Sequence, residues 1–138
     1  MVTSYHKGKS LRQYLHDWKK PHSLKPLLLD LIRIIVKIMD TLQYLIKTHA
    51  IIHRDLKPDN IIYNETGGEV ALIDFGLANK YIKDPNHKDS EFVGTIQYMA
   101  PELLNKESMN HNKSDLWSLG IIIYELFSNG KYPWNAES

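Results

Sequence analysis

The chain has 138 residues, 43% of them hydrophobic, which is enough for one domain with a single core. Its 17 lysines and arginines stand against 16 aspartates and glutamates, so the net charge of +1 gives no general attraction to nucleic acid or anionic membranes. The absence of cysteine excludes a disulfide scaffold and a thiolate metal site. The first residues form no apolar signal-peptide core, and we expect a cytoplasmic or nuclear setting, with no nucleic-acid or membrane partner.

The first part of the chain predicts two helices. A short amphipathic helix is expected after Ser10, a suitable N-cap, with the apolar residues Leu11, Tyr14, Leu15 and Trp18. A long helix is predicted over residues 27–49, because apolar residues recur there at intervals of three and four. Charged residues interrupt this stretch, so it is interpreted as a core helix and not as a membrane span. Its packed face is expected to contain Leu28, Leu31, Ile32, Ile35, Ile38, Met39, Leu42, Leu45 and Ile46.

The middle of the chain predicts short strands. Residues 51–52, 60–63 and 70–73 are rich in isoleucine, valine and leucine, and the turn Thr66-Gly67-Gly68 joins the last two into a small hairpin. Residues 81–90 are polar and are predicted to form a loop.

The last predicted element is a helix over residues 115–128. It is apolar on nearly every side, so it is expected in the middle of a domain, and Trp117 is expected to pack in the core. Trp134 is expected to pack within the loop that follows this helix.

Three motifs stand in a fixed order along these elements. They are H-R-D-L-K-P-D-N at residues 53–60, D-F-G at 74–76 and A-P-E at 100–102, followed by D-L-W-S-L-G at 115–120. Phosphoryl transfer needs one carboxylate that orients a hydroxyl, and an amide and a second carboxylate that hold metal ions on the phosphates. The chain resembles the C-terminal lobe of the eukaryotic-type serine/threonine protein kinase family over nearly its whole length.

The resemblance implies a fold class and a domain. We expect a mainly α-helical α+β fold with a small β-hairpin, without the N-terminal lobe and the last helices of the lobe. Residues 1–138 would then be a partial kinase domain that runs from the hinge to the loop after the central helix.

The resemblance also implies roles for the motif residues. Asp55 would be the catalytic base or hydroxyl-orienting residue, and Lys57 would neutralise the transferring phosphate of ATP. Asn60 and Asp74 would each hold a magnesium ion. An inactive relative that keeps Asp55 and Lys57 only as a loop anchor is the alternative.

Residues outside these motifs would complete the nucleotide site. Ser4 and His6 are expected on the hinge that meets adenine, and Ile62 is expected beneath the base. The glycine-rich phosphate loop and the V-A-I-K-like lysine of the family have no counterpart in the 138 residues. We therefore expect the binding site to be open on one side.

Further positions are assigned by the same resemblance. His53 and Phe75 are expected to pack together, anchored by Asp115, and Arg54 is expected to pair with an activation-loop phosphate or a nearby carboxylate. In this register Ser90 and Glu91 fall where many kinases carry the phosphorylated residue.

The acceptor specificity is indicated by Gly94-Thr95 and Lys57, and the expected stability of the fold depends on Glu102. The segment Gly94-Thr95 and the placement of Lys57 favour Ser or Thr of a protein substrate as the acceptor. Glu102 has no evident partner among Arg12, Arg33 and Arg54, so its burial would leave an unpaired charge.

Alternative functions remain open at this point. The chain can be a kinase catalytic segment, completed by a separate N-terminal lobe, or a non-catalytic lobe that binds or inhibits an intact kinase or its regulator. A gene fragment without function is a third hypothesis, and a small-molecule kinase is disfavoured by Lys57 and the A-P-E motif. A metal site built on histidines is rejected because no histidine pair has ligand spacing; the scattered histidines are His6, His16, His22, His49, His87 and His111.

Overall fold

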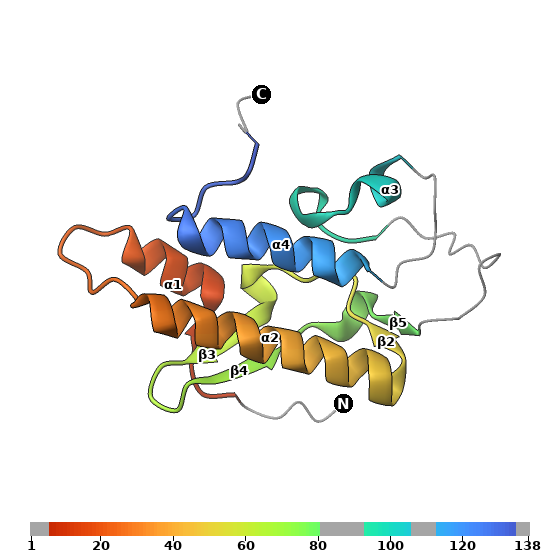
Figure 1. Cartoon of the computed structure of the whole chain (residues 1–138), viewed down its shortest axis with the longest axis horizontal. Coiled ribbons are helices and arrows are strands. Elements are labelled where there is room, and N and C mark those ends of the chain that lie inside the picture. Colours follow the sequence, from red (N-terminus) through yellow and green to blue (C-terminus); the bar gives the residue numbers. More distant parts are fainter. Residues whose placement is uncertain (1–5, 81–92, 106–112, 135–138) are drawn as a thin grey trace.

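A computed structural model describes residues 6–80, 93–105 and 113–134 (Figure 1). The fold is α+β, with small antiparallel sheets beside the helices. The helices are α1 (Leu11–Trp18), α2 (Leu28–His49), α3 (Pro101–Leu104) and α4 (Ser114–Phe127). The strands are β1 (Lys9–Ser10), β2 (Ile51–Ile52), β3 (Ile61–Asn64), β4 (Glu69–Leu72) and β5 (Asn79–Lys80). Short 3-10 turns are η1 (Pro58–Asn60), η2 (Phe75–Leu77) and η3 (Ile96–Tyr98). The predicted loop at 81–90 lies outside the described residues.

Helix α1 begins where its sequence predicts. The Ser10 side chain accepts a hydrogen bond from the backbone N–H of Gln13 at 3.2 Å, which satisfies one of the free donors of the first turn. The apolar residues of α1 are all buried in the core, namely Leu11, Tyr14, Leu15 and Trp18. The predicted helix and its buried face are confirmed.

Helix α2 is also confirmed, but its buried face is narrower than predicted. The helix begins one residue later than expected, where Asp30 accepts a hydrogen bond from the N–H of Leu27 at 3.2 Å, and Ala50 ends it with a left-handed backbone. The buried residues of α2 are Leu31, Ile34, Ile38 and Leu42. Leu28, Ile32 and Met39, which were expected on the packed face, are exposed. Because α2 is apolar on several sides, its periodicity alone did not select the face that packs.

The predicted hairpin is present as β3 and β4, with Ile61 opposite Leu72 and Asn64 opposite Glu69. Strand β1, which was not predicted, adds to its free edge, and the order of the sheet is β1-β3-β4. Gly8 precedes β1 with φ of 125°, and a Cβ atom there would lie 2.3 Å from the carbonyl oxygen of Tyr63. The close approach of β1 to β3 therefore requires glycine at this position.

Helix α4 lies beside α2, with its N-terminal end near the C-terminal end of α2 (Figure 1). Its inner face is buried through Leu119, Ile122 and Leu126. The helix was expected in the middle of a domain with Trp117 in the core, but only its inner face is buried. Its opposite face is exposed through Leu116, Trp117, Tyr124 and Phe127. Trp134 is 40% exposed, and its ring stacks on that of Tyr132 with centroids 6.3 Å apart, so the expected packing of Trp134 within the loop is confirmed.

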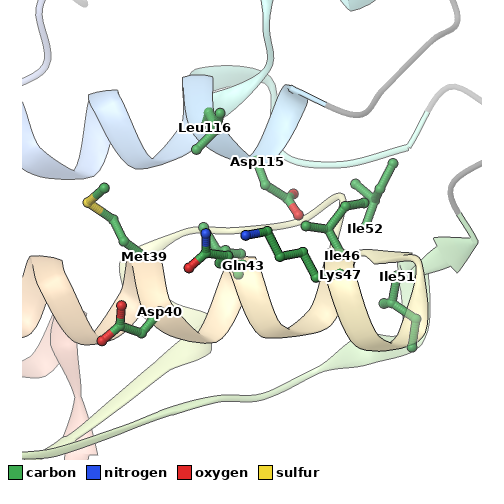
Figure 2. Close-up of a pocket in the computed structure, with 10 residues that line it drawn as sticks. Met39, Asp40, Gln43, Ile46, Lys47, Ile51, Ile52, Asp115 and Leu116 are labelled. Carbon is green, nitrogen blue, oxygen red and sulfur yellow. The ribbon is translucent and has the colours of Figure 1, made fainter.

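A cavity of about 370 Å³ separates the exposed sides of the two helices (Figure 2). Met39 and Ile46 of α2 line it, together with Ile52 of β2 and Leu116 of α4. Asp115 lies at its edge (Figure 2). We call the apolar residues that line this cavity the α2–α4 face; they are Met39, Leu42, Ile46, Ile51, Ile52 and Leu116. No helix in the described part of the chain is long and apolar enough to cross a membrane.

A buried charged network joins α1 to α4 on the other side of the core. Arg12 donates a hydrogen bond to the carboxylate of Glu125 at 2.9 Å, and the side chain of Glu125 is fully buried. The hydroxyl of Tyr98, which lies in η3, donates to the second oxygen of the same carboxylate and accepts from Arg12. Burial and the hydrogen bond with Glu125 raise the pKa of Tyr98, so this hydroxyl stays protonated as a donor. The three side chains tie α1, η3 and α4 together.

Replacing Arg12 tests how much this network contributes to the free energy of unfolding. The change Arg12→Ala leaves the buried Glu125 carboxylate without its cation, and we expect the free energy of unfolding to fall by about 3 kcal/mol. The matched control is Arg33→Ala, because Arg33 pairs with Asp30 at 3.8 Å on the surface and its loss should cost less than about 0.5 kcal/mol. Urea denaturation measures both values, and equal values for the two variants would contradict the assigned role.

The α2–α4 face predicts self-association of the isolated chain. Its exposed apolar side chains make a patch of a kind that soluble monomers rarely leave open. We expect light scattering to show oligomers at micromolar concentration, and the double change Met39→Glu, Leu116→Lys to shift the chain toward monomer. Leu104→Ser removes a leucine outside this face that is 42% exposed, and it should have no effect. A monodisperse unmodified monomer that binds no hydrophobic dye would refute the prediction.

Candidate active site

The site is organised by the carboxylate of Asp115, which lies in the first turn of α4. Its two oxygens accept hydrogen bonds from the backbone N–H groups of His53 at 2.8 Å and Arg54 at 3.0 Å. Burial raises the pKa of Asp115, while the two N–H donors act in the opposite direction. Arg54 has a left-handed backbone with φ of 66°, a conformation that costs energy outside glycine and is held here by these bonds. Asp115 therefore fixes the start of the 53–60 loop.

The imidazole of His53 connects the 53–60 loop to the D-F-G segment. Its Nε2 donates to the carbonyl oxygen of Ile73 at 2.8 Å, and its Nδ1 accepts from the N–H of Asp55 at 3.2 Å. The two contacts together require the neutral ring with its proton on Nε2. The ring is fully buried and packs edge to face on Phe75, with centroids 4.9 Å apart. The predicted packing of His53 on Phe75, with Asp115 as the anchor, is confirmed.

Asp55, Lys57 and Thr95 form one connected polar group. The Thr95 hydroxyl donates to the Asp55 carboxylate at 2.7 Å and accepts from the Lys57 ammonium at 2.9 Å. The Lys57 nitrogen lies 3.7 Å from the second carboxylate oxygen of Asp55. The structure therefore places a carboxylate, a hydroxyl and a cation in direct contact.

Gly94 allows the segment that carries Thr95 to approach the 53–60 loop. Its φ is 118°, and a Cβ atom at this position would lie 2.8 Å from the carbonyl oxygen of Arg54. A side chain would push the segment away, so glycine is required for the contact between Thr95 and Asp55.

Asn60 is buried at the end of η1, and its amide is oriented by its neighbours. The Nδ2 group donates to the backbone oxygen of Asp55 at 2.8 Å and lies 3.3 Å from a carboxylate oxygen of the same residue. Within the described part of the chain the side-chain oxygen of Asn60 has no hydrogen-bond donor, although the residue is only 5% exposed. A buried oxygen of this kind is a suitable ligand for a hard cation.

Asp74 follows directly after Ile73, whose backbone bonds to that of Asn60. The N–H of Ile73 donates a hydrogen bond to the carbonyl oxygen of Asn60 at 2.9 Å, and Asp74 is the next residue in the chain. Asp74 has a left-handed backbone with φ of 58° and is exposed, and Gly76 donates to its carboxylate at 3.4 Å. An amide oxygen and a carboxylate are oxygen donors of the type Mg²⁺ prefers, so Asn60 and Asp74 fit a magnesium site. In residues 6–80, 93–105 and 113–134, no cluster of three histidine, aspartate or glutamate side chains forms a self-sufficient metal centre.

Of the residues expected to contact the nucleotide, Ile62 and His6 lie in the described part of the chain. Ile62 is half-buried in β3, with Ser10 of β1 opposite it. His6 is exposed outside the sheet, and Ser4 lies outside the described residues. Ser90 and Glu91, the expected partners of Arg54, also lie outside them. Arg54 does donate to the carbonyl oxygen of Leu77 at 2.6 Å.

Sequence reasoning missed the network of Arg12, Tyr98 and Glu125. A signal was present, because Glu125 is a single carboxylate inside an otherwise apolar stretch of α4, which indicates a buried partner. Arg12 was considered only as a partner for Glu102. Glu102 is half-buried in α3, and it takes part in none of the ion pairs found among the described residues.

Comparison with known proteins agrees with this geometry. The family described as the protein kinase domain matches residues 1–138. An Aurora kinase of Dictyostelium discoideum is 39% identical over 102 residues, which is 74% of this chain and 25% of that protein. The mitogen-activated protein kinase kinase 5 of Leishmania mexicana is 38% identical over 112 residues, 81% of this chain and 20% of that protein. Sperm motility kinase 3A of Mus musculus is 36% identical over 132 residues, 94% of this chain and 24% of that protein. The chain spans about a quarter or less of each of these relatives and belongs to the eukaryotic-type protein kinase family.

Proposed function

We propose that the chain is the catalytic segment of a serine/threonine protein kinase, which transfers the γ-phosphate of ATP to a hydroxyl of a protein substrate. The observation that carries the proposal is the contact of Asp55 with the Thr95 hydroxyl at 2.7 Å, with the Lys57 ammonium 2.9 Å from the same hydroxyl oxygen. The carboxylate is thus positioned to accept a hydroxyl proton, next to a cation that can stabilise a phosphoryl group.

In this proposal each residue has one task. Asp55 orients the acceptor hydroxyl and takes its proton, and Lys57 compensates the negative charge that moves with the phosphoryl group. The buried amide of Asn60 keeps Asp55 in position through its two contacts with that residue. Bound Mg-ATP would supply the phosphoryl group, and the side-chain oxygens of Asn60 and Asp74 would hold its metal ions.

Serine or threonine as the acceptor is supported by the position of Lys57, and a protein substrate by the name of a relative. Lys57 stands two residues after Asp55 and bonds to Thr95, the arrangement that resembles serine/threonine kinases. A relative named ribosomal protein S6 kinase alpha-1 from Homo sapiens is 41% identical over 88 residues, 64% of this chain and 11% of that protein. By its name that relative acts on a ribosomal protein, and we propose a protein substrate for this chain as well.

We further propose that residues 1–138 correspond to the C-terminal lobe, from the hinge through the loop after the central helix α4. Ser4, His6 and Ile62 would then form the lower wall of the adenine site. The sequence contains no glycine-rich phosphate loop, so the upper wall would come from an N-terminal lobe. A cytoplasmic or nuclear setting, with a protein substrate, remains part of this proposal.

A non-catalytic role is the second candidate. The α2–α4 face is exposed and apolar, as expected for a lobe that binds or inhibits an intact kinase or its regulator. The two proposals differ in one consequence, because only the catalytic role depends on the carboxylate of Asp55.

The catalytic proposal predicts weak activity for the isolated chain. Without a phosphate-covering loop and its lysine, most of the positioning and charge stabilisation is missing, so transfer to a serine/threonine peptide should be far below the ~1–100 s⁻¹ typical of kinases. Addition of a kinase N-terminal lobe should raise the rate. Asp55→Asn should then abolish transfer without loss of fold, whereas Asp40→Asn, an exposed aspartate on α2, should change nothing. An active Asp55→Asn protein would disprove the assigned base.

The same open site predicts weak nucleotide binding. Magnesium relies on phosphate oxygens and water besides one or two protein ligands, so we expect a dissociation constant for Mg-ATP in the millimolar range, about −4 kcal/mol. Titration calorimetry should show further weakening for Asp74→Ala and none for Asp40→Ala. Micromolar binding to the unmodified chain would show that these residues replace the missing wall.

A further inference from the structure

The connection between α1 and α2 forms a tip at one end of the molecule. Residues 19–29, which we call the α1–α2 tip, comprise this connection and the start of α2, and the connection projects away from α3 and β5 (Figure 1). The tip contains Lys19, Lys20 and Lys25 and no acidic residue. Neither the fold nor the proposed chemistry assigns it a role.

The tip exposes an unusual amount of leucine. Leu24 is 93% exposed, Leu27 69%, Leu28 60% and Leu29 62%. Single exposed apolar residues are common on proteins, but four leucines within six positions form a local apolar surface. Because these four leucines are exposed, they do not contribute to the hydrophobic core of this chain.

The tip is also held in a defined shape. The Ser23 hydroxyl donates to the carbonyl oxygens of Trp18 at 3.1 Å and Lys20 at 2.8 Å, and Asp30 accepts from the N–H of Leu27. Trp18 is buried beneath the connection. The leucines are therefore presented outward by an ordered backbone.

The charges around the tip leave it positive. Asp17 binds Lys20 at 3.0 Å and Lys9 at 3.1 Å, and Asp30 lies 3.8 Å from Arg33, so the nearest acids on α1 and α2 are already paired. Glu65, from the hairpin turn, is the remaining acid beside the tip, and it lines a small depression together with Lys25. In the part of the chain that the structure describes, neither Lys19 nor Lys25 has an ion pair.

We propose that the α1–α2 tip docks on an anionic lipid surface, with the leucines in the interfacial layer and the lysines at the headgroups. Exposed leucines beside lysines are complementary to such a surface, which is apolar below and negative above. The tip projects outward, which suits a flat membrane better than a partner helix, because a helix needs an apolar groove. The net charge of +1 for the whole chain gives no general attraction, so binding depends on this local surface.

Vesicle binding of the full chain tests the proposal. We expect cosedimentation with vesicles of phosphatidylcholine and phosphatidylserine, and much weaker binding to phosphatidylcholine alone. Leu24→Ser with Leu28→Ser should lower the partition coefficient at least tenfold. Lys19→Glu with Lys25→Glu should also lower it at least tenfold and reduce its salt dependence.

Matched controls lie at the opposite end of the molecule. Leu104→Ser and Lys80→Glu alter one exposed leucine and one exposed lysine far from the tip and should change binding less than twofold. Circular dichroism verifies that all variants keep the fold. Equal binding to both kinds of vesicle, or equal loss in the control variants, would overturn the proposal. Absence of vesicle binding, with lysine-dependent binding to polyglutamate instead, would overturn it in favour of an acidic protein partner.

Discussion

The structure depends most on one buried carboxylate. Asp115 comes from α4 and accepts hydrogen bonds from two successive backbone N–H groups of the 53–60 loop, about 60 residues earlier in the chain. A carboxylate that accepts two backbone donors replaces much of the hydration that it loses on burial. The loop is thereby fixed relative to α4. His53 in turn bonds to the carbonyl oxygen of Ile73, the residue before Asp74. The proposed catalytic groups thus share one support, although they come from different segments.

The charges at the site follow a simple arrangement. Asp55 and Lys57 share the Thr95 hydroxyl, and the amide of Asn60 is directed at Asp55, so its oxygen remains available for a cation. These contacts hold the groups in place without a bound substrate, which would reduce the cost of reorganisation in the proposed reaction. The network of Arg12, Tyr98 and Glu125 adds a second connection to α4, because η3 follows directly after Thr95. The segment that presents Thr95 is therefore supported at both ends.

The sequence predicted the elements that have strong local signals. Helix α1 was recognised from Ser10 and its apolar spacing, and the β3–β4 hairpin from its glycine turn. Strands β1 and β5 have two residues each and depend on distant partners, so local pattern could not reveal them. The packed face of α2 was partly misassigned because apolar residues occupy several sides of that helix. Contacts such as Thr95 with Asp55 depend on tertiary structure, and no local spacing contains them.

The central claim is that Asp115 holds the 53–60 loop through the N–H groups of His53 and Arg54, and amide hydrogen exchange measures it most directly. The account predicts that these two amides exchange only when the whole chain unfolds, as slowly as the amides in the middle of α2. The amide of Lys7, which lies in an exposed segment without regular structure, should exchange rapidly and serves as the reference. Exchange of the His53 and Arg54 amides as fast as that of Lys7 would show that the carboxylate does not hold the loop, and would contradict the account.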